Sequence, residues 1–581
     1  MGRMKYWLNA AITIAIGLSC LMGCSGLIQA TNSSQSQIVD AILSDPKTFN
    51  PVLSSDATSS SVAAMMFDGL ITSNPITGET EPALAESWRI SDDDLEIIFT
   101  LREDLKWSDD IPITADDVVF TFNDLYFNEA IPYNGRATLK IGEGKQFPVV
   151  TKVSDREVKF TLTEPFAPFF DTVGKSILPK HILEPTVKRK DAEGNPVFLT
   201  TWGVDTPPDR FVVNSAYKMA SYANAQRIIF TANPNYWKEA KGEQLPNIRR
   251  VVWQIVESTD TSFLQFRSGG LDSLSITPEY FSLLKKEANR GNFTIYNGGP
   301  AYGTVYITFN LNKSKRNDKP LVDPIKSQWF NDVRFRQAVA YALDRDRMIN
   351  NIYRGLGEAQ NSPMSIQSPF YDESLKGYSF NRDRARELLK EAGFTHNQRG
   401  QLLDSNGNRV VFTLNTNAGN KIREALGSQI KQDLSKIGIQ VNFKPLAFNL
   451  LLDSLDSTLQ WDCILLGLTG GNEPNNGANV WYPDGDLHMF NQAKPDLRGR
   501  VVASWEEDIE RLYIQAAKEL DFDKRKQIYA QAQEIISQQL PFIYLVNPLS
   551  LGAVRNDIQG IEYSALGGAY WNLPELKISE N

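Results

Sequence analysis

The sequence predicts an α/β protein that folds into two or more lobes. Its 581 residues exceed the roughly 250–300 residues at which a single hydrophobic core stops growing. Hydrophobic residues make up 42% of the chain and charged residues 22%, as in ordinary globular proteins. Helix-like and strand-like segments alternate, which is typical of a sheet covered by helices. The clearest alternation comprises a helix capped by Asn381 and ended by Gly393, a strand at 410–417, an amphipathic helix at 421–437 and a strand at 439–446.

The N-terminus has the layout of a secretory signal. Arg3 and Lys5 precede a long apolar run, and this order of charged and apolar residues is typical of such signals. The sequence LMGC at 21–24 resembles the lipobox of bacterial lipoproteins, in which cleavage before the cysteine leaves it to carry a lipid. We therefore expect residues 1–23 to be removed and Cys24 to tether the chain to the cell membrane, on the periplasmic side. The alternative is an uncleaved membrane anchor, although the run is at the short limit for a span of ~20 residues.

The segment after the signal, residues 24–37, is rich in Ser, Gln, Asn and Thr. It has too little apolar surface to fold, so we expect a flexible tether. With Cys20 removed and Cys24 lipidated, Cys463 is left alone in an apolar strand, so no internal disulfide is predicted. The formal net charge is −9, and loss of the two basic residues of the signal makes it −11. An acidic chain of this kind is a poor candidate for binding nucleic acid or an anionic membrane surface.

Residues 57–125 predict a region of mixed helix and strand. The serines at 59–61 are expected to cap a helix. Apolar residues at 95, 97 and 99 alternate with polar ones, as in a half-buried strand. Thr114, with Asp117 three residues on, forms a capping-box-like start to a second helix.

Many short motifs occur in one order along nearly the whole mature chain. They are DPKTFNP at 45–51, FDGL at 67–70, AESW at 85–88, FTLREDLKW at 99–107, ITADDVVFTFNDL at 113–125, ILPKHILE at 177–184, ANPNYW at 232–237, FRSGGLDSL at 266–274, YITFNLN at 306–312 and NDVRFRQAVAYALDRDRMINNIYRG at 331–355. In this order they resemble the extracytoplasmic solute-binding proteins of peptide ABC importers, a family that includes oligopeptide-, dipeptide- and nickel-binding proteins. Each motif alone is weak, but their shared order makes the resemblance specific.

The resemblance implies a two-lobed periplasmic-binding-protein fold (type II, cluster C-like). The ligand would lie between the lobes, and the chain crossings would act as hinges. The first lobe would be discontinuous and would carry an inserted subdomain. The implied boundaries are residues 38–65, 206–305 and 542–581 for lobe I, residues 66–205 for the inserted subdomain, and residues 306–541 for lobe II.

The resemblance also implies a function. The chain would be the lipid-anchored binding component of a peptide importer, capturing peptides and delivering them to a permease whose ATPase subunits supply the energy. An extended peptide exposes unpaired N–H and C=O groups, so a cleft that pairs with them recognises peptides through the backbone. We expect a monomer without a cofactor, which contacts peptide, the permease and, through its lipid only, the membrane.

One stretch, WDCILLGLTGGNEPNNGANVW at 461–481, changes abruptly from apolar residues to glycine and asparagine. It predicts a buried strand that delivers a polar loop to a cleft. Amide side chains donate and accept hydrogen bonds but are poor nucleophiles and bases, so such a loop suits binding. Glycines let the backbone approach a ligand closely. An ordinary surface loop is the alternative, because Gly and Asn also favour turns.

The family implies a specific role for this loop. In its peptide binders the loop usually carries an aspartate, in a pattern like G-W-x-G-D, which pairs with the amino terminus of the ligand. The matching residues here are 467–471, where Leu468 replaces the tryptophan and Gly471 the aspartate. Glu473 is a candidate substitute for the missing charge, and the alternative is that the asparagines bind peptide carbonyls or sugar-like hydroxyls. The candidate ligand-binding residues are Thr469, Gly470, Gly471, Asn472, Glu473, Asn475, Asn476, Asn479 and Trp481 from this stretch, together with Tyr302, Tyr306 and Arg423.

Four of these candidates have a competing interpretation. Trp481, Tyr302 and Tyr306 either line a side-chain pocket or pack in the core. Arg423 approximately matches the place where dipeptide binders hold a partner for the ligand carboxylate, and solvent exposure is its alternative.

The sequence lacks the motifs of catalysis. It has three histidines, none with a His or Cys at metal-ligand spacing, and His396 and His488 are expected in polar loops. Neither GxSxG nor HExxH occurs, and the segment GKS at 174–176 lacks the first glycine of a phosphate loop, where Phe169 stands. We therefore expect a protein that is not an enzyme and has no metal site. Two other functions stay open: the same fold binding an oligosaccharide or a metal chelate, and a secreted hydrolase or interaction protein.

Overall fold

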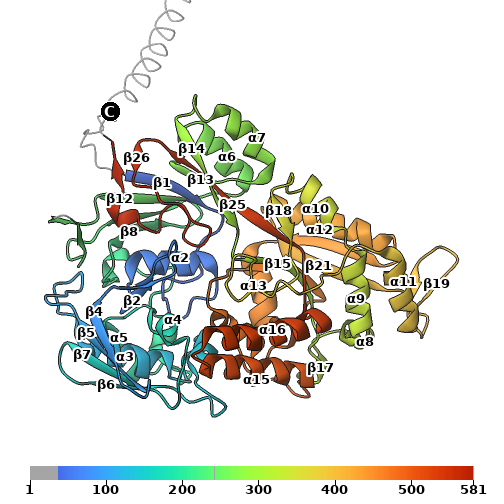
Figure 1. Cartoon of the computed structure of the whole chain (residues 1–581), viewed down its shortest axis with the longest axis horizontal. Coiled ribbons are helices and arrows are strands. Elements are labelled where there is room, and N and C mark those ends of the chain that lie inside the picture. Colours follow the sequence, from blue (N-terminus) through green and yellow to red (C-terminus); the bar gives the residue numbers. More distant parts are fainter. Residues whose placement is uncertain (1–36, 241, 580–581) are drawn as a thin grey trace, which may run out of the picture. The chain divides into compact units, whose positions relative to one another are not determined.

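The computed structural model describes residues 37–240 and 242–579 (Figure 1). The predicted signal peptide, its cleavage site and Cys24 lie outside these residues, as does the predicted tether up to residue 36. Within the described ranges, no helix combines the length and the apolar character needed to cross a membrane.

A four-stranded sheet joins the start of the described chain to its middle. β1 (Gln37–Ile42) runs parallel to β12 (Arg250–Ile255), and β9 (Arg227–Ala232) and β8 (Tyr217–Ala223) follow in antiparallel order. The sheet therefore holds together segments that are far apart in the sequence.

A second sheet joins the middle of the chain to its C-terminal part. Its long strand, β25 (Val546–Arg555), pairs antiparallel with β13 (Ser273–Ser275), β14 (Phe293–Pro300) and β18 (Gly357–Ala359), as Figure 1 shows. The two sheets touch, because a backbone hydrogen bond of 2.8 Å runs from the amide of Asp272 to the carbonyl of Val39. Two helices belong to this part of the chain, α6 (Thr259–Arg267) and α7 (Pro278–Glu287).

A third sheet is antiparallel and lies in the part of the chain predicted as the inserted subdomain. Its strands, in spatial order, are β4 (Ala85–Ile90), β5 (Glu96–Leu101), β7 (Glu157–Thr161) and β6 (Val149–Lys152). Ile97 and Phe99 of β5 are buried and alternate with half-buried residues, which confirms the predicted half-buried strand.

Of the two helix caps predicted for this region, one is confirmed and one is wrong. The prediction that the serines at 59–61 cap a helix is wrong, because the carboxylate of Asp56 accepts from the amide of Ser59 at 2.9 Å and caps the helix instead. Thr114 and Asp117 form the predicted capping box. The helices are α2 (Ala57–Met66), α3 (Ala115–Phe120), α4 (Phe169–Val173) and α5 (Lys180–Lys188).

A five-stranded mixed sheet forms the second half of the fold. Its strands, in spatial order, are β22 (Gln440–Leu446), β21 (Val411–Asn417), β23 (Cys463–Leu468), β15 (Thr304–Phe309) and β24 (Phe542–Tyr544). β21 is parallel to β22 and β23, whereas β15 is antiparallel to β23 and β24. α12 (Lys421–Ser435) connects β21 to β22 and packs on them, which confirms the predicted strand, helix and strand. Cys463 to Leu466 are buried, as expected of the strand before the glycine-rich loop.

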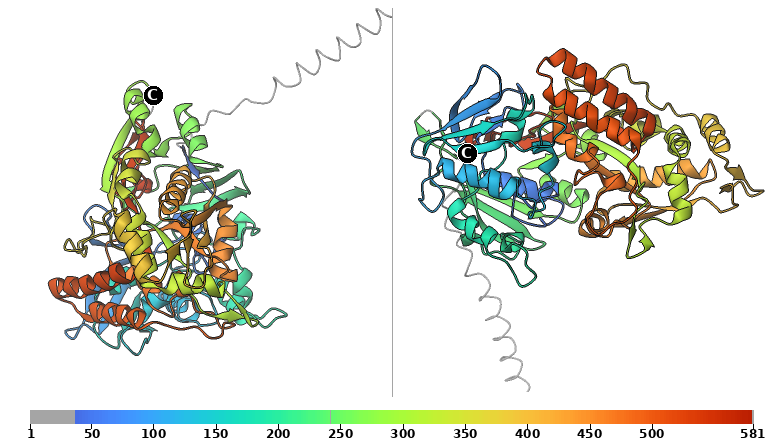
Figure 2. Two further views of the ribbon diagram at one scale, coloured as in Figure 1. Left: turned by 90° about the vertical axis from the view of Figure 1, so that its right-hand side faces the viewer. Right: turned by 90° about the horizontal axis from the view of Figure 1, so that it is seen from below.

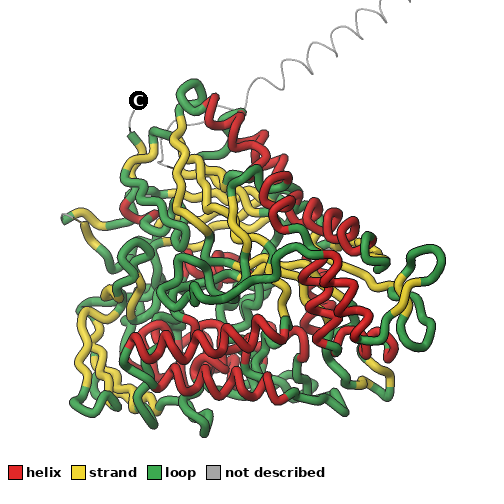
Figure 3. The backbone as a smooth tube through the Cα atoms, turned by 45° about the vertical axis from the view of Figure 1, so that its right-hand side comes forward, coloured by secondary structure: helices red, strands yellow, loops and turns green. Residues whose placement is uncertain are grey.

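Helices surround this sheet. α15 (Ser504–Lys518) and α16 (Phe522–Gln539) lie side by side, which Figures 2 and 3 show from different directions. Asn381 caps its helix as predicted. The other helices here are α8 (Pro324–Asn331), α9 (Val333–Ala342), α10 (Arg345–Asn351), α11 (Arg382–Glu391), α13 (Phe448–Asp453) and α14 (Ala478–Trp481).

Short two-stranded pairs complete the described elements. They are β2 (Ile71–Ser73) with β3 (Thr80–Pro82), β10 (Glu239–Ala240) with β11 (Glu243–Gln244), β16 (Lys315–Arg316) with β17 (Lys319–Pro320), β19 (Thr395–His396) with β20 (Leu402–Leu403), and β26 (Ile558–Gln559) with β27 (Lys577–Ile578).

Two large hydrophobic cores and a smaller third one underlie these sheets, and the third packs α6 and α7 against the second sheet. One is drawn almost entirely from residues 306–546 and surrounds the five-stranded sheet. The other is drawn mainly from residues 38–251. The chain is thus an α/β protein with a separate core on each side of the β14–β15 connection, while the lobe boundaries themselves stay a prediction.

Candidate ligand-binding site

The loop after β23 is shaped by two glycines that do different things. A Cβ atom on Gly470 would lie 1.8 Å from the carbonyl oxygen of Tyr302, so a side chain there would push the two backbones apart. A Cβ atom on Gly471 would meet no atom within 4 Å. Gly470 therefore lets the loop pack tightly against the chain before β15, whereas Gly471 leaves open space beside the loop.

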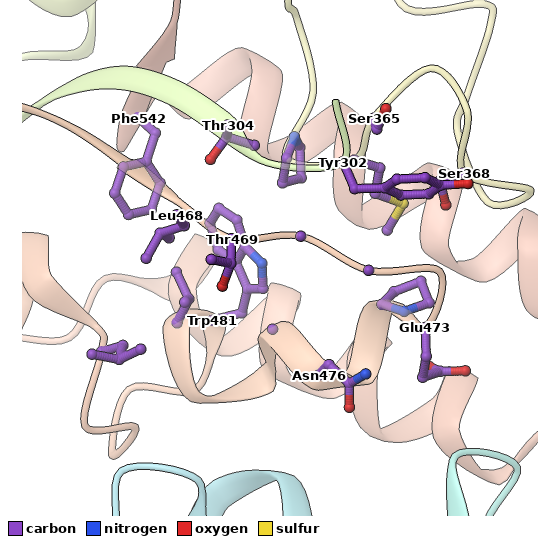
Figure 4. A pocket seen from close by; sticks show the side chains of 18 of the residues that line it. Tyr302, Thr304, Ser365, Ser368, Leu468, Thr469, Glu473, Asn476, Trp481 and Phe542 are labelled. Carbon is purple, nitrogen blue, oxygen red and sulfur yellow. The ribbon is translucent and has the colours of Figure 1, made fainter. Parts of the chain in front are cut away.

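This space belongs to a cavity of about 310 Å³, at the lower end of the ~300–1,000 Å³ typical of small-molecule sites. One wall is the loop with the turns that follow it, η6 (Pro474–Gly477) and α14. Another comes from Tyr302 and the segment 363–368. In Figure 4, Tyr302 and Asn476 lie on opposite sides of the loop.

The structure brings most of the candidate residues together around this cavity. Those that line it are Thr469, Gly470, Gly471, Glu473, Asn476, Asn479, Trp481, Tyr302 and Tyr306. Those that do not line it are Asn472, Asn475 and Arg423. Lining residues that the sequence did not single out include Thr304, Met364, Ser365, Ser368, Tyr513, Phe542 and Tyr544.

The main chain of Thr469, Gly470 and Gly471 is unpaired. β23 ends at Leu468, and no hydrogen bond among the described residues involves the amide or carbonyl groups of the next three. All three residues are exposed, so their main-chain groups can exchange water for the polar groups of a ligand. Because these residues line the cavity, a ligand in it has main-chain donors and acceptors within reach.

Glu473 lines the cavity as one half of a buried ion pair. Its Oε1 lies 2.5 Å from Nη2 of Arg525, and both side chains are only 8% exposed. The same carboxylate accepts from the amide of Asn475 at 2.9 Å and so caps η6. Burial alone would lower the pKa of Arg525, but the charge of Glu473 outweighs it and raises that pKa. Glu473 is therefore not a free anion, in contrast to the substitute charge that the sequence suggested.

The asparagines of the loop have different surroundings. Asn476 lines the cavity. Asn479 donates through Nδ2 to the carbonyl of Asn134 at 3.1 Å, which ties the loop to the region of the third sheet. Asn475 is 2% exposed and packs beneath the loop. Asn472 lies beside Gly78, at the tip of the β2–β3 hairpin.

The aromatic candidates both pack and line the cavity. Trp481 is 4% exposed and meets Phe542 edge to face with ring centroids 5.6 Å apart. Tyr306 is fully buried, and its hydroxyl lies 3.2 Å from the sulfur of Met489. The two interpretations offered by the sequence therefore do not exclude each other, because one face of such a ring can be core while another faces the cavity.

Arg423 supports the strand instead of lining the cavity. Its Nη1 donates to Oδ1 of Asn417 at 2.8 Å, and a Cβ on Gly467 would come within 2.9 Å of Nη2. Burial lowers its pKa, and no carboxylate of the described residues lies within ion-pair distance. Arg423 is half-buried, so the alternative that it is solvent-exposed does not describe its position.

His488 is buried, in contrast to the polar loop expected for it. Its Nδ1 lies 2.8 Å from the carbonyl of Val480, and its Nε2 lies 2.7 Å from Oε2 of Glu506. Burial alone would raise the pKa of Glu506, but the hydrogen bonds from His488, Ala503 and Asn491 lower it overall. Because Val480 lines the cavity, this pair fixes the wall from behind.

Ion pairs connect the segment that carries the cavity to the region that contains the third sheet. Lys145 lies 3.2 Å from Asp484 and 2.5 Å from Glu510. Lys518 lies 2.6 Å from Glu164. These contacts, with the Asn479 hydrogen bond, hold the inserted region against the segment that carries the cavity.

Local sequence carried little signal for Arg525, His488 or the segment 363–368. Arg525 occupies a helix that alternates polar and apolar residues, where an arginine usually faces solvent. Its partner lies 52 residues away along the chain, so only the fold reveals the pair. Across the described ranges, no group of three or more His, Cys, Asp or Glu side chains is placed to hold a metal ion.

The sequence and fold match proteins already known. Residues 79–487 match the profile of the bacterial extracellular solute-binding proteins, family 5. A probable ABC transporter-binding protein of Deinococcus radiodurans is 30% identical, over 90% of this chain and 88% of its own. The dipeptide-binding protein of Escherichia coli is 25% identical, over 97% of this chain and 98% of its own. The structure of a periplasmic binding protein, MelB, from Agrobacterium fabrum in complex with stachyose superposes with a TM-score of 0.81 at 21% identity, covering 94% of this chain and 85% of that one.

Proposed function

The chain belongs to family 5 of the bacterial extracellular solute-binding proteins, and we propose that it is the lipid-anchored binding component of a peptide ABC importer that captures short peptides in the cavity beside β23. Membership of a family of binding proteins agrees with the expected absence of enzymatic function. It also confirms the predicted two-lobed α/β fold and an extracytoplasmic location.

The observation that carries the proposal is the unpaired main chain of residues 469–471 in the cavity wall. An extended peptide offers the complementary amide and carbonyl groups, and pairing with them is independent of the peptide's sequence. The aromatic rings of Tyr302 and Trp481 supply apolar surface for side chains. The volume of about 310 Å³ favours a short peptide.

The contacts of Lys145, Lys518 and Asn479 support a closed arrangement of the proposed lobes. Lobe closure around a ligand is a hinge motion, and the ligand stabilises the closed form. In the proposed function this closed, loaded form is the one that the permease recognises.

A second candidate ligand is an oligosaccharide. The neutralised Glu473, the amide of Asn476 and the ring of Trp481 form a neutral, aromatic wall that suits sugar hydroxyls and the apolar faces of sugar rings. The stachyose complex of a protein with this fold is consistent with that alternative.

Thermal unfolding of the purified mature protein distinguishes the two. A pool of short peptides at 100 times its dissociation constant stabilises a protein that binds it by about 2.7 kcal/mol. We expect the peptide pool to raise the melting temperature, and a pool of oligosaccharides of matched size to leave it unchanged. If only the oligosaccharides raise the melting temperature, the ligand is a sugar and not a peptide.

Several finer features belong to the same proposal. Lipid on Cys24 would keep the protein near its permease, and residues 24–37 would give it reach. The lobes are proposed as residues 38–65, 206–305 and 542–581 with the insertion 66–205, and residues 306–541. The protein is proposed to work as a monomer, with Asn472, Asn475 and Arg423 supporting the binding loop and its strand.

A further inference from the structure

One face of the five-stranded sheet forms the floor of the cavity. In the antiparallel pairs of β15, Thr304 lies opposite Leu468, and Tyr306 lies opposite Tyr544. Side chains at directly opposite positions, and at every second position of a strand, point to the same face of a sheet. These four side chains and Phe542, two residues before Tyr544, all line the cavity. Three neighbouring strands therefore hold the side chains of the floor in fixed positions.

The residues that line the cavity differ widely in exposure. The loop 469–471 is exposed, as is Asn476. The aromatic side chains at the other end are at most 5% exposed, and they are Tyr306, Trp481, Tyr513, Phe542 and Tyr544. The cavity thus has an exposed mouth with unpaired main chain and a buried aromatic end. A ligand group that packs against these rings gives up most of its contact with water.

The wall of the cavity carries no net charge. Among the described residues that line it, Glu473 is the only one with a carboxylate or a cationic side chain. Its charge is paired with Arg525 at 2.5 Å, so a charged ligand group at the buried end would meet no counter-charge. Burying such a group without a partner costs far more than burying an uncharged one. The buried end therefore favours an uncharged group.

Thr304 supplies a hydroxyl to this end that has no partner. The residue is 6% exposed, and its Oγ1 is buried without a hydrogen-bond partner among the described residues. Figure 4 shows this oxygen on the side where Phe542 and Trp481 lie. The hydroxyl of Tyr306, on the same strand, contacts the sulfur of Met489 instead. Leaving a buried hydroxyl unpaired is costly, and a ligand atom in the cavity can pair with it.

We propose that the buried end of the cavity is a specificity pocket for an uncharged ring of the ligand that carries one polar atom, and that the hydroxyl of Thr304 hydrogen-bonds to this atom. The inference rests on the proposed function, because it assumes a ligand in the cavity beside β23. In a peptide, the side chain of tyrosine has this chemistry, since its ring packs against aromatic walls and its hydroxyl both donates and accepts. Thr304 is then a residue that determines specificity, whereas the loop after β23 recognises the backbone.

Competition between tripeptides tests this assignment. The purified mature protein is incubated with an equimolar excess of alanine tripeptides that carry Tyr, Phe, Lys or Glu at one position, and all three positions are scanned. The bound peptides are counted by mass spectrometry after gel filtration. At one position we expect wild type to enrich Tyr over Phe about fivefold, and Phe over Lys and Glu at least about tenfold.

Three variants identify the hydroxyl. Thr304→Val removes it and keeps the shape of the side chain, so the ratio of Tyr to Phe should fall to about one or below, while Lys and Glu stay excluded. Thr304→Ser keeps the hydroxyl and should keep part of the preference. Thr308→Val is the matched control on the same face of β15, because the hydroxyl of Thr308 donates to the carbonyl of Pro541 at 2.9 Å and Thr308 does not line the cavity. This control should keep the wild-type ratio.

The ratios compare bound peptides with one another, so they do not depend on the fraction of folded protein. If wild type binds the peptides without preferring Tyr over Phe, or if Thr304→Val keeps the preference, the inference is overturned and the proposed function stands. The same follows if the Lys and Glu peptides bind as well as the Phe peptides at every position. If wild type binds no peptide, the proposed function and the inference fail together.

Discussion

Replacing Glu473 with glutamine leaves Arg525 as a buried cation without its carboxylate. Removing one partner of a buried ion pair costs about 3–5 kcal/mol. We expect the lower end, about 3 kcal/mol, because the glutamine oxygen still accepts a hydrogen bond from Arg525. A cooperative unit of the size of residues 306–541 has an unfolding entropy of about 0.5 kcal/mol/K. The melting temperature should therefore fall by about 6 °C.

The assay is calorimetric unfolding of five proteins: wild type, Glu473→Gln, Glu473→Met, Arg525→Met and the double variant Glu473→Met with Arg525→Met. Replacing both charges with apolar side chains of similar size is often neutral, so the double variant should melt closer to wild type than Arg525→Met does. Glu473→Gln should bind peptides with free and with acetylated amino termini more weakly by the same factor, because in wild type the carboxylate is paired with Arg525. A shift below about 1 °C, or additive losses in the double variant, would refute the ion pair as the main role of Glu473.

Three further predictions concern the loop, the closure and the pH dependence. Gly470→Val should destabilise the protein by roughly 2 kcal/mol and abolish thermal stabilisation by the ligand, because its Cβ would collide with the carbonyl of Tyr302. In Gly471→Ala the added Cβ meets open space, so this variant should keep the wild-type stability and the stabilisation by the ligand. Lys145→Ala should weaken ligand binding about threefold in calorimetric titrations at low salt, since its half-buried ion pairs are worth up to ~1 kcal/mol, and unchanged affinity would count against a role in closure. The folded-state pKa of Glu506 is lowered, so its ionised carboxylate contributes stability that is fully present above the unfolded pKa of about 4.3 and is lost as the pH falls through the lower folded-state pKa. In urea unfolding, Glu506→Gln should therefore be less stable than wild type at neutral pH, and this difference should disappear in acid. A constant difference between wild type and Glu506→Gln from pH 7 to about pH 3 would contradict that linkage.

Periodicity in the sequence was sufficient for the elements that build the second half of the fold. The alternation at 410–446 encodes two strands and a helix locally, and the structure contains β21, α12 and β22 there. The abrupt change at Gly467 likewise located the end of β23 and the loop at the cavity. The helix cap at Asp56 was missed because three serines follow it, and only geometry shows which oxygen reaches the first turn.

The pairing of the charged side chains at the site could not be predicted from their neighbours in the sequence. Glu473 is paired by a residue 52 positions later in the sequence. Burial decided the remaining differences, because His488 has polar neighbours in the sequence but is fully buried, and Arg423 is half-buried. Side-chain partners that come from distant segments leave no spacing for a motif to record.

A crystal structure of the native protein with the ligand that copurifies with it tests the central claim most directly. We expect a short peptide in the cavity, with its main chain hydrogen-bonded to the amides and carbonyls of Thr469, Gly470 and Gly471. A ligand bound elsewhere, or one that occupies the cavity and leaves this main chain unpaired, would contradict it.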